Sequence, residues 1–162
     1  MKPLLQLIVV SDRAAQGVRP DATAPLLQPH VAACGFSMGE VRVVPDEIPA
    51  IEAALRAAIR SGGLVLTTGG TGPALRDVTP EATRLVIQRE LPGFGEAMRM
   101  ASFHTIPTAL GSRAIAGLAG AALVVNLPGS PKGALDCFQL IAPAALHVLR
   151  VVGGEAGDCA RP

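Results

Sequence analysis

Four polar stretches that follow expected strands hold groups that could bind phosphate and a divalent cation. The run Thr68, Gly69, Gly70, Thr71 and Gly72 offers backbone N–H groups and hydroxyls where a chain can approach a ligand closely, which is how phosphates are cradled. A tight turn alone would also explain these glycines. The run matches neither the P-loop signature nor the three-glycine dinucleotide signature, so both of those nucleotide-binding classes are disfavoured.

Two aspartates, Asp46 and Asp77, follow expected strands, and both carboxylates could face one pocket. Hard oxygen ligands suit Mg²⁺, which could bridge phosphate oxygens there. Each Asp taken singly could instead cap a turn or a helix, as aspartates in such positions commonly do. Arg76 could neutralise phosphate charge or be an ordinary solvated residue.

A third polar stretch is Pro128, Gly129, Ser130, Pro131 and Lys132. Ser130 could hydrogen-bond an anion at the start of a helix, although N-capping would explain a serine there as well. Lys132 could neutralise phosphate charge or be solvated. Ser11 and Asp12 follow the first aliphatic run in the same way.

Other reactive side chains show no catalytic pattern. The three histidines lie far apart in the sequence without metal-ligand spacing. Cys34, Cys137 and Cys159 show neither a disulfide framework nor a zinc motif, which favours a reducing cytoplasm. We expect Cys137 to lie on a helix with its side chain buried, and not to act as a nucleophile.

The polar stretches require elements to position them. Strands are predicted at Leu4–Val10, Val41–Val44, Leu64–Thr68 and Leu123–Leu127. Helices are predicted over Thr23–Ala33, Ile48–Ile59, from Thr79 as N-cap, over Gly95–His104 after a break at Pro92-Gly93, and over Lys132–Val152 with an interruption at Pro143. The segment Ser112–Gly120 is compatible with strand or helix. This alternation predicts a doubly wound α/β sheet, whose ligands bind beyond the carboxyl ends of the strands.

Composition bounds the class of protein. The 162 residues fit one domain, which we place at residues 1–153, with residues 154–162 as a C-terminal tail. The net charge of +1 and the absence of Trp and Tyr argue against nucleic-acid binding. The longest uninterrupted apolar-or-glycine run is Ala114–Val125, too short to span a bilayer, so we expect no membrane association.

Several motifs together closely resemble one known family. They are Val44-Pro45-Asp46-Glu47, Leu66 to Gly72, Arg76 to Thr83, Pro92-Gly93, Ser112-Arg113 and Asn126 to Gly133. In this order and spacing they resemble the molybdenum cofactor biosynthesis family that includes MogA, MoaB and the G domains of plant and animal homologues. The resemblance covers nearly the whole chain.

The resemblance implies a three-layer α/β/α sandwich with a mostly parallel sheet, usually assembled as a homotrimer. It implies an enzyme that transfers AMP from Mg-ATP to molybdopterin, releases pyrophosphate, and makes transient contact with a molybdenum insertase. Asp46 and Asp77 match the family's essential aspartates, which act on Mg²⁺ and position phosphates. The loop Gly69–Gly72 matches its nucleotide and anion cradle. Ser130, with Gly129 and Lys132, matches the segment that holds the pterin and its terminal phosphate, and Ser11 and Asp12 match the first-strand loop near the site.

Two points remain open at the level of sequence. A non-catalytic molybdopterin-binding or scaffold protein could share the fold, although the retention of both aspartates argues for the enzyme. The chain also departs from many relatives at Ala24, where they carry a glycine before the proline. If that position needs a positive φ, the loop must differ here.

Overall fold

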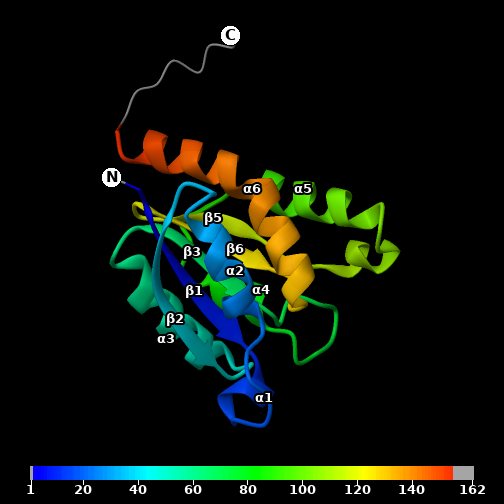
Figure 1. The fold of residues 1–162 in the computed structure, drawn as a ribbon. Helices are drawn as coiled ribbons and strands as arrows, with labels where there is room; N and C mark the ends of the chain where they lie inside the picture. Colours follow the sequence, from blue (N-terminus) through cyan, green and yellow to red (C-terminus); the bar gives the residue numbers. More distant parts are fainter. Residues whose placement is uncertain (1, 155–162) are drawn as a thin grey trace.

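Residues 2–154 of the computed structural model are described, and within them six strands form one sheet with helices on both faces (Figure 1). The strands are β1 (Leu4–Val10), β2 (Ser37–Val44), β3 (Gly63–Thr68), β4 (Arg89–Glu90), β5 (Ala116–Ala119) and β6 (Ala122–Leu127). The helices are α1 (Asp12–Ala15), α2 (Thr23–Val31), α3 (Ile48–Ile59), α4 (Thr79–Arg84), α5 (Pro92–Phe103), the 3₁₀ helix η1 (Pro107–Gly111) and α6 (Pro131–Val152). The strand order is β2-β1-β3-β6-β5-β4.

The first four strands of this order run parallel, and their carboxyl ends are aligned. Val10 pairs with Val44, Val9 with Thr68, and Thr68 with Leu127. Because these residues lie beside one another, the loops that follow β1, β2, β3 and β6 leave the sheet at one edge. The predicted convergence of the polar stretches is therefore confirmed.

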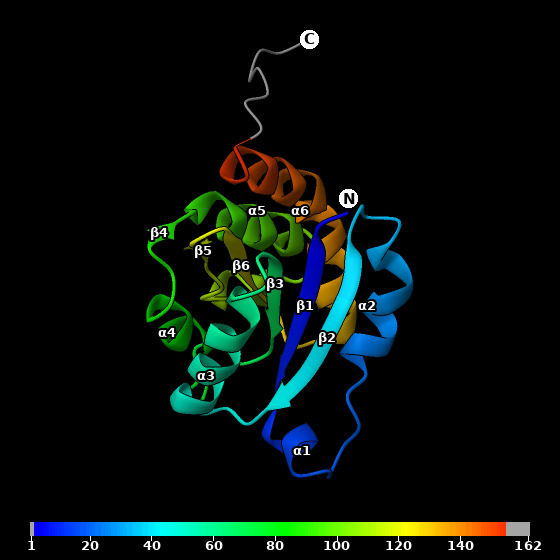
Figure 2. The same ribbon diagram turned by 90° about the vertical axis from the view of Figure 1, so that its left-hand side faces the viewer.

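Strands β1, β3 and β6 are buried and largely apolar on both faces, which is why helices cover both, whereas the edge strand β2 is exposed or half-buried along most of its length (Figure 2). Leu7 belongs to a core shared with α2, α5 and α6, whereas its neighbour Ile8 belongs to a core shared with α3 and α4. Successive side chains of a strand point to opposite faces, so the two cores lie on opposite sides of one sheet. The three-layer α/β/α sandwich is confirmed.

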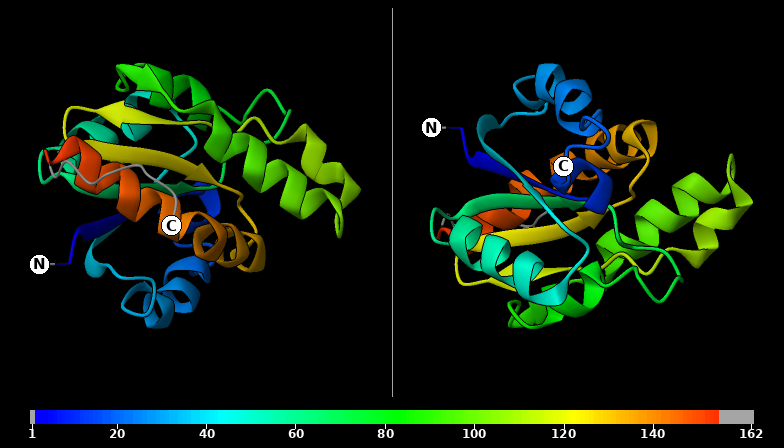
Figure 3. Two further views of the ribbon diagram at one scale, coloured as in Figure 1. Left: turned by 90° about the horizontal axis from the view of Figure 1, so that it is seen from above. Right: turned by 90° about the horizontal axis from the view of Figure 1, so that it is seen from below.

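One edge of the sheet differs from a purely parallel arrangement. β5 pairs antiparallel with β6, and β4 pairs antiparallel with β5. The ambiguous segment Ser112–Gly120 thus contains a strand, and Arg89–Glu90 forms one that the sequence did not indicate. Beyond these strands, α5 and η1 extend past the sheet as an arm (Figure 3).

Three sequence predictions about helix ends are wrong in detail. Thr79 is the first residue of α4 rather than its N-cap, which is Val78, and its hydroxyl does not cap the helix but donates to the backbone oxygen of Gly69 at 2.8 Å. Pro92 begins α5 instead of breaking the chain, since a proline is tolerated in a first helical turn. The helix α6 continues through Pro143 without interruption.

The residues around Ala24 need no glycine. Ala24 lies inside α2, and every residue with positive φ in residues 2–154 is a glycine. Both carboxylate oxygens of Asp21 accept backbone N–H groups, from Thr23 and Ala24, at 2.8 Å. This side chain therefore starts α2 in a helical conformation that alanine adopts without strain.

The C-terminal helix ends the described part of the chain. Of the predicted tail 154–162, residues 155–162, including Cys159, lie outside the described residues. Among residues 2–154, α6 is the only helix long and apolar enough to cross a membrane by length and composition. Core helices of folded domains pass the same test, and α6 packs Phe138, Ile141 and Leu149 into the core.

Candidate active site

A polar cavity of about 370 Å³ opens at the aligned strand ends. Ser11, Thr68, Gly69, Gly129 and Ser130 line it, so three of the four strand-end loops contribute. The segment from Arg19 to Thr23, which leads into α2, closes another side. Five of the residues predicted to bind substrate therefore share one hollow.

An apolar cavity of about 230 Å³ lies beside the polar one. Ser130 lines both cavities, and Thr71, Gly72 and Pro128 line the apolar one. The glycine loop and the Pro128–Lys132 segment are thus not two separate sites, because each contributes to both hollows.

Further walls of the apolar cavity come from residues that sequence reasoning missed. They include Met98, Arg99 and Ser102 of α5, Ile106 and Thr108 near η1, and Cys137 of α6. No local motif marks them, because they belong to helices and not to strand ends. Arg99 donates to the backbone oxygens of Ser112 and Ala114, at 3.3 and 2.9 Å, and so ties α5 to the segment before β5.

Cys137 stays a packing residue, as predicted. It is buried, and burial raises the pKa of its thiol above the usual value. The thiol therefore remains protonated near neutral pH, and a protonated thiol is a poor nucleophile.

The glycine loop requires its glycines. Gly69 and Gly70 have φ of +97° and +63°, a region that residues with a side chain rarely adopt. A Cβ on Gly69 would stand 2.3 Å from the backbone oxygen of Val10, and one on Gly70 would stand 2.4 Å from the Thr79 hydroxyl. The loop is pressed against β1 and α4, which fixes the direction of its N–H groups.

The two predicted aspartates lie on either end of this loop. A Cβ on Gly70 would be 3.2 Å from Oδ1 of Asp46, and one on Gly72 would be 2.8 Å from Oδ2 of Asp77. The loop is therefore in contact with both carboxylates, although neither aspartate lines one of the two cavities.

The electrostatics of the aspartates fit a divalent cation. The pKa of Asp46 is raised, first by partial burial and second by the negative charge of Asp77. A cation between the two carboxylates would relieve that repulsion. In residues 2–154, no cluster of three or more His, Cys, Asp or Glu side chains is placed to hold a metal. The two carboxylates could therefore hold Mg²⁺ only with further ligands from phosphate and water.

Asp12 holds the loop after β1 against the loop after β2. Its Oδ1 accepts the backbone N–H of Asp46, and Asp46 Oδ2 accepts the backbone N–H of Asp12. Arg76 forms an ion pair with Asp12, so its charge is directed to this carboxylate and not to an open cavity. Ser11 accepts the backbone N–H of Ala14 at 3.3 Å and so caps α1.

Ser130 and Lys132 differ in how well they fit an anion site. Ser130 stands at the N-cap of α6, yet its hydroxyl makes no capping hydrogen bond. The hydroxyl is therefore free for a ligand. Lys132 instead pairs with Asp136 at 2.6 Å, with its side chain 80% exposed, and lines neither cavity.

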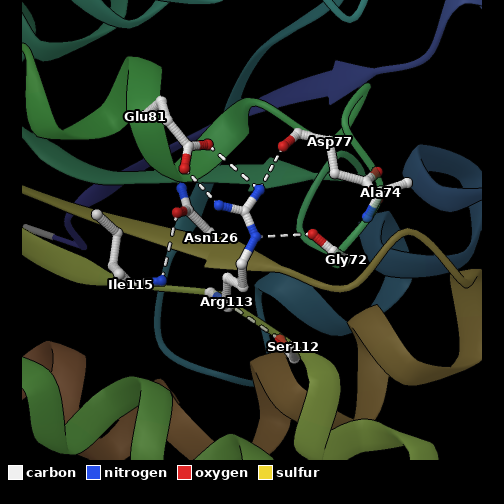
Figure 4. A network of polar contacts seen from close by, with 9 residues as sticks. Gly72, Ala74, Asp77, Glu81, Ser112, Arg113, Ile115 and Asn126 are labelled. Atoms are coloured by element: carbon white, nitrogen blue, oxygen red, sulfur yellow. Dashed lines mark hydrogen bonds and ion pairs between the residues drawn. The ribbon is translucent and has the colours of Figure 1, made fainter.

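Arg113 connects the two ends of the loop that carries Asp77 (Figure 4). Its guanidinium donates to the backbone oxygen of Gly72 at 2.8 Å, to the backbone oxygen of Asp77, and to the carboxylate of Glu81. Sequence analysis assigned Arg113 no role beyond its place in a motif.

A buried amide supports the same region from below. Asn126 of β6 donates to the hydroxyls of Thr67 and Thr83, both at 2.9 Å, and accepts the backbone N–H of Ile115 at 3.3 Å. Asn126, Thr67 and Thr83 are fully buried, so every polar atom of this amide is used inside the core. The contacts join β3, β6 and α4 beneath the glycine loop.

Comparisons with known proteins place these residues in a family context. Residues 6–147 match the family described as the probable molybdopterin binding domain. The molybdopterin adenylyltransferases of Haemophilus influenzae and Escherichia coli are 50% and 44% identical over 148 residues, which is 88% of this chain and 75% of each relative. The crystal structure of the molybdopterin biosynthesis enzyme MoaB from Thermus thermophilus matches with a TM-score of 0.87 at 42% identity, covering 94% of this chain and 97% of that one.

Proposed function

The chain belongs to the family of molybdopterin-binding domains, and we propose that it acts as a molybdopterin adenylyltransferase in molybdenum cofactor biosynthesis. It is an adenylyl-transferring enzyme whose substrates are ATP and molybdopterin. AMP passes from ATP to molybdopterin and pyrophosphate leaves. The fold and the family support this conclusion together, since they cover the same residues.

The observation that carries the proposal is the position of the glycine loop between Asp46 and Asp77. Phosphoryl-type transfer depends on in-line positioning and on neutralisation of charge more than on covalent chemistry by the protein. Backbone N–H groups with fixed directions would position the phosphates, and a Mg²⁺ ion held by the two carboxylates would neutralise their charge. The loop Gly69–Gly72 would cradle the phosphates of ATP through the N–H groups of Gly70, Thr71 and Gly72, because the Gly69 N–H already donates to the backbone oxygen of Leu127.

Asp46 and Asp77 are the proposed catalytic residues and the proposed Mg²⁺ ligands. When bound, Mg²⁺ would neutralise the phosphate oxygens and the developing charge of the leaving pyrophosphate. Asp46 would hold its carboxylate in place through the contact with Asp12, and Asp77 through the contact of its Oδ2 with the backbone N–H of Ala74 at 3.1 Å.

The molybdopterin end of the site is assigned to the segment after β6. Ser130 would donate its free hydroxyl to the terminal phosphate of the pterin, with Pro128 and Gly129 shaping the wall. Lys132 would bind such a phosphate only if its ion pair with Asp136 broke first. Ser11, Asp12 and Thr68 complete the polar side of the site.

Assembly and location follow the same family pattern. We propose a homotrimer in the cytoplasm, built from one domain spanning residues 1–153, that meets a molybdenum insertase transiently. The mean hydropathy of +0.42 and an apolar groove lined by Leu91, Phe94, Leu140 and Ile141, between α5 and α6, support the burial of surface between subunits.

The direct test is to incubate the purified protein with molybdopterin, ATP and Mg²⁺. An adenylylated pterin and stoichiometric pyrophosphate, both dependent on the pterin, are expected. Tight pterin binding with no pyrophosphate would instead identify a binding or scaffold protein. Measuring pterin binding and pyrophosphate in the same preparation separates these outcomes.

A further inference from the structure

The loop between β3 and α4 is exposed at its tip and carries a residue of the active site. Leu75 is fully exposed, and Pro73, Ala74 and Arg76 are exposed as well. Few apolar contacts hold such a loop, so its shape depends on polar contacts with neighbouring elements. The proposed function of this loop requires Gly72 and Asp77 to keep the same position relative to each other.

Arg113 supplies contacts at both ends of this loop. Its backbone N–H donates to the oxygen of Thr71 at 2.8 Å, and its Nε donates to the oxygen of Gly72 at 2.8 Å. Its Nη2 donates to the backbone oxygen of Asp77. One residue from the segment before β5 therefore holds the glycine loop and the start of α4 together, as Figure 4 shows.

An arginine near a phosphate site is usually interpreted as a phosphate ligand, but the partners of Arg113 argue otherwise. Its Nη1 and Nη2 both donate to the Glu81 carboxylate, which compensates the positive charge. The pKa of Glu81 is lowered, first by this hydrogen bond, so the carboxylate stays ionised at neutral pH. Arg113 lines neither cavity. Most of its donors and its charge are already used within the protein.

We propose that Arg113 is a positioning residue, which holds Asp77 and the glycine loop in register, and that Glu81 in turn fixes the guanidinium. The positioning of the loop by Arg113 does not depend on the proposed function. Only its consequence, the placement of Asp77 for catalysis, rests on that function. A lysine cannot reproduce the arrangement, because its single ammonium lacks the planar fork that reaches three acceptors on different segments.

The test compares Arg113→Lys and Glu81→Gln with wild type, and uses Arg56→Lys as the matched control. Arg56 also donates to a glutamate, Glu52, and to a backbone oxygen, that of Leu85, but it lies on α3 away from the site. Arg113→Lys and Glu81→Gln, which we call the clamp variants, each keep a hydrogen-bonding side chain of similar size. Circular dichroism would establish that they fold.

The first readout is amide hydrogen exchange in the free protein, which needs no substrate. Residues 70–78 should exchange faster in Arg113→Lys and Glu81→Gln, and at wild-type rates in Arg56→Lys. Unchanged exchange in both clamp variants would overturn the proposal. Because this readout is independent of turnover, it stands even if the protein fails to adenylylate molybdopterin.

The second readout is the dependence of pyrophosphate release on Mg²⁺. We expect a loss of about 10- to 100-fold in kcat/KM for both clamp variants, with the Mg²⁺ titration shifted to higher concentration, as for partners that orient metal ligands. The Arg56→Lys control should match wild type. If Glu81→Gln instead bound ATP more tightly, the freed guanidinium would be a phosphate ligand and the positioning role would be wrong.

Discussion

Asp12 and Asp46 are joined by two crossed hydrogen bonds, in which the backbone N–H of each donates to the carboxylate of the other over 3.0 and 3.1 Å. The pair links the loop after β1 to the loop after β2, across adjacent parallel strands. An aspartate that belongs to the proposed metal site is therefore held by an aspartate from another loop, and its position depends on both strands.

Asp12→Ala should impair catalysis by releasing Asp46. The change removes the acceptor for the Asp46 N–H, and we expect kcat/KM for ATP to fall by about 10- to 100-fold. Asp12→Asn keeps a side-chain oxygen and should retain more activity. Arg76→Gln is the control, because its exposed ion pair with Asp12 is expected to contribute about 1 kcal/mol or less. Wild-type kinetics for Asp12→Ala would contradict the linkage.

Asp46→Asn and Asp77→Asn should each abolish adenylyl transfer while the fold is retained. Both substitutions keep the shape of the side chain and remove a charge directed at Mg²⁺. Pyrophosphate release and far-UV circular dichroism are the two measurements. Turnover at the wild-type rate in either variant would rule out that residue as a Mg²⁺ ligand.

The Asp46 variant should also show a characteristic pH dependence of stability. The folded-state pKa of Asp46 is raised by burial and by Asp77. Between the usual pKa of 3.8 and the raised value, the folded protein holds a proton that the unfolded chain has lost, so the free energy of unfolding falls as pH rises through this window. Above the window, Asp46→Asn should be more stable than wild type. Urea unfolding should show that advantage shrinking below pH 3.8.

Ser130→Ala should weaken molybdopterin binding without destabilising α6. The hydroxyl makes no capping hydrogen bond, so its loss leaves no helix donor newly unsatisfied. A hydrogen bond to a charged group typically contributes about 1.5 to 3 kcal/mol, and calorimetry should show that loss for molybdopterin with ATP nearly unaffected. Reduced affinity for ATP alone would reverse the assignment of the two ligands. Ser11→Ala, which removes a hydroxyl that does cap a helix, is the comparison for stability.

Asn126→Ala should strongly destabilise the protein. It leaves the Ile115 N–H and the hydroxyls of Thr67 and Thr83 without their buried partner. A buried group left unsatisfied costs about 1 to 3 kcal/mol, and we expect a total loss of about 3 kcal/mol in urea unfolding. Thr83→Ser keeps the hydroxyl and should lose much less. Equal losses for the two variants would show that packing, and not hydrogen bonding, sets the cost.

Light scattering at micromolar concentration should give the mass of a trimer. The groove between α5 and α6 offers a place to test the contact, because Leu140→Arg would put a charge on an exposed apolar position. If the groove lies in the interface, this variant should shift the mass toward the monomer while circular dichroism stays unchanged. A monomeric wild-type protein would refute the assembly.

Sequence patterns predicted the parallel core and the polar residues at its carboxyl edge because the signals there are local. Buried parallel strands read as aliphatic runs, and polar residues directly follow each one. β5 gave no such signal: Ala116 and Gly117 have weak strand propensity, and the segment is a strand because β6 pairs with it. Tertiary context decides such short segments.

The site residues divide along the same line. Asp46, Asp77 and the glycine loop could be proposed from sequence because they follow strands. Arg113 could not, because its side-chain acceptors lie 32 to 41 residues away in the sequence. For Lys132 the sequence did not indicate the ion pair with Asp136, four residues later and one turn along α6, and its role toward phosphate stays a prediction.

Because Ser130 lines both cavities, the shape of the site affects how the product dissociates from the enzyme. If the two substrates enter the two adjoining cavities, the joined product occupies both of them at once. Each half then keeps the other close to its own cavity, so a half that detaches rebinds before the whole molecule escapes. Dissociation of the product would be slow and product inhibition strong. A downstream enzyme that binds one exposed end of the product would then remove it faster than it is released into solution.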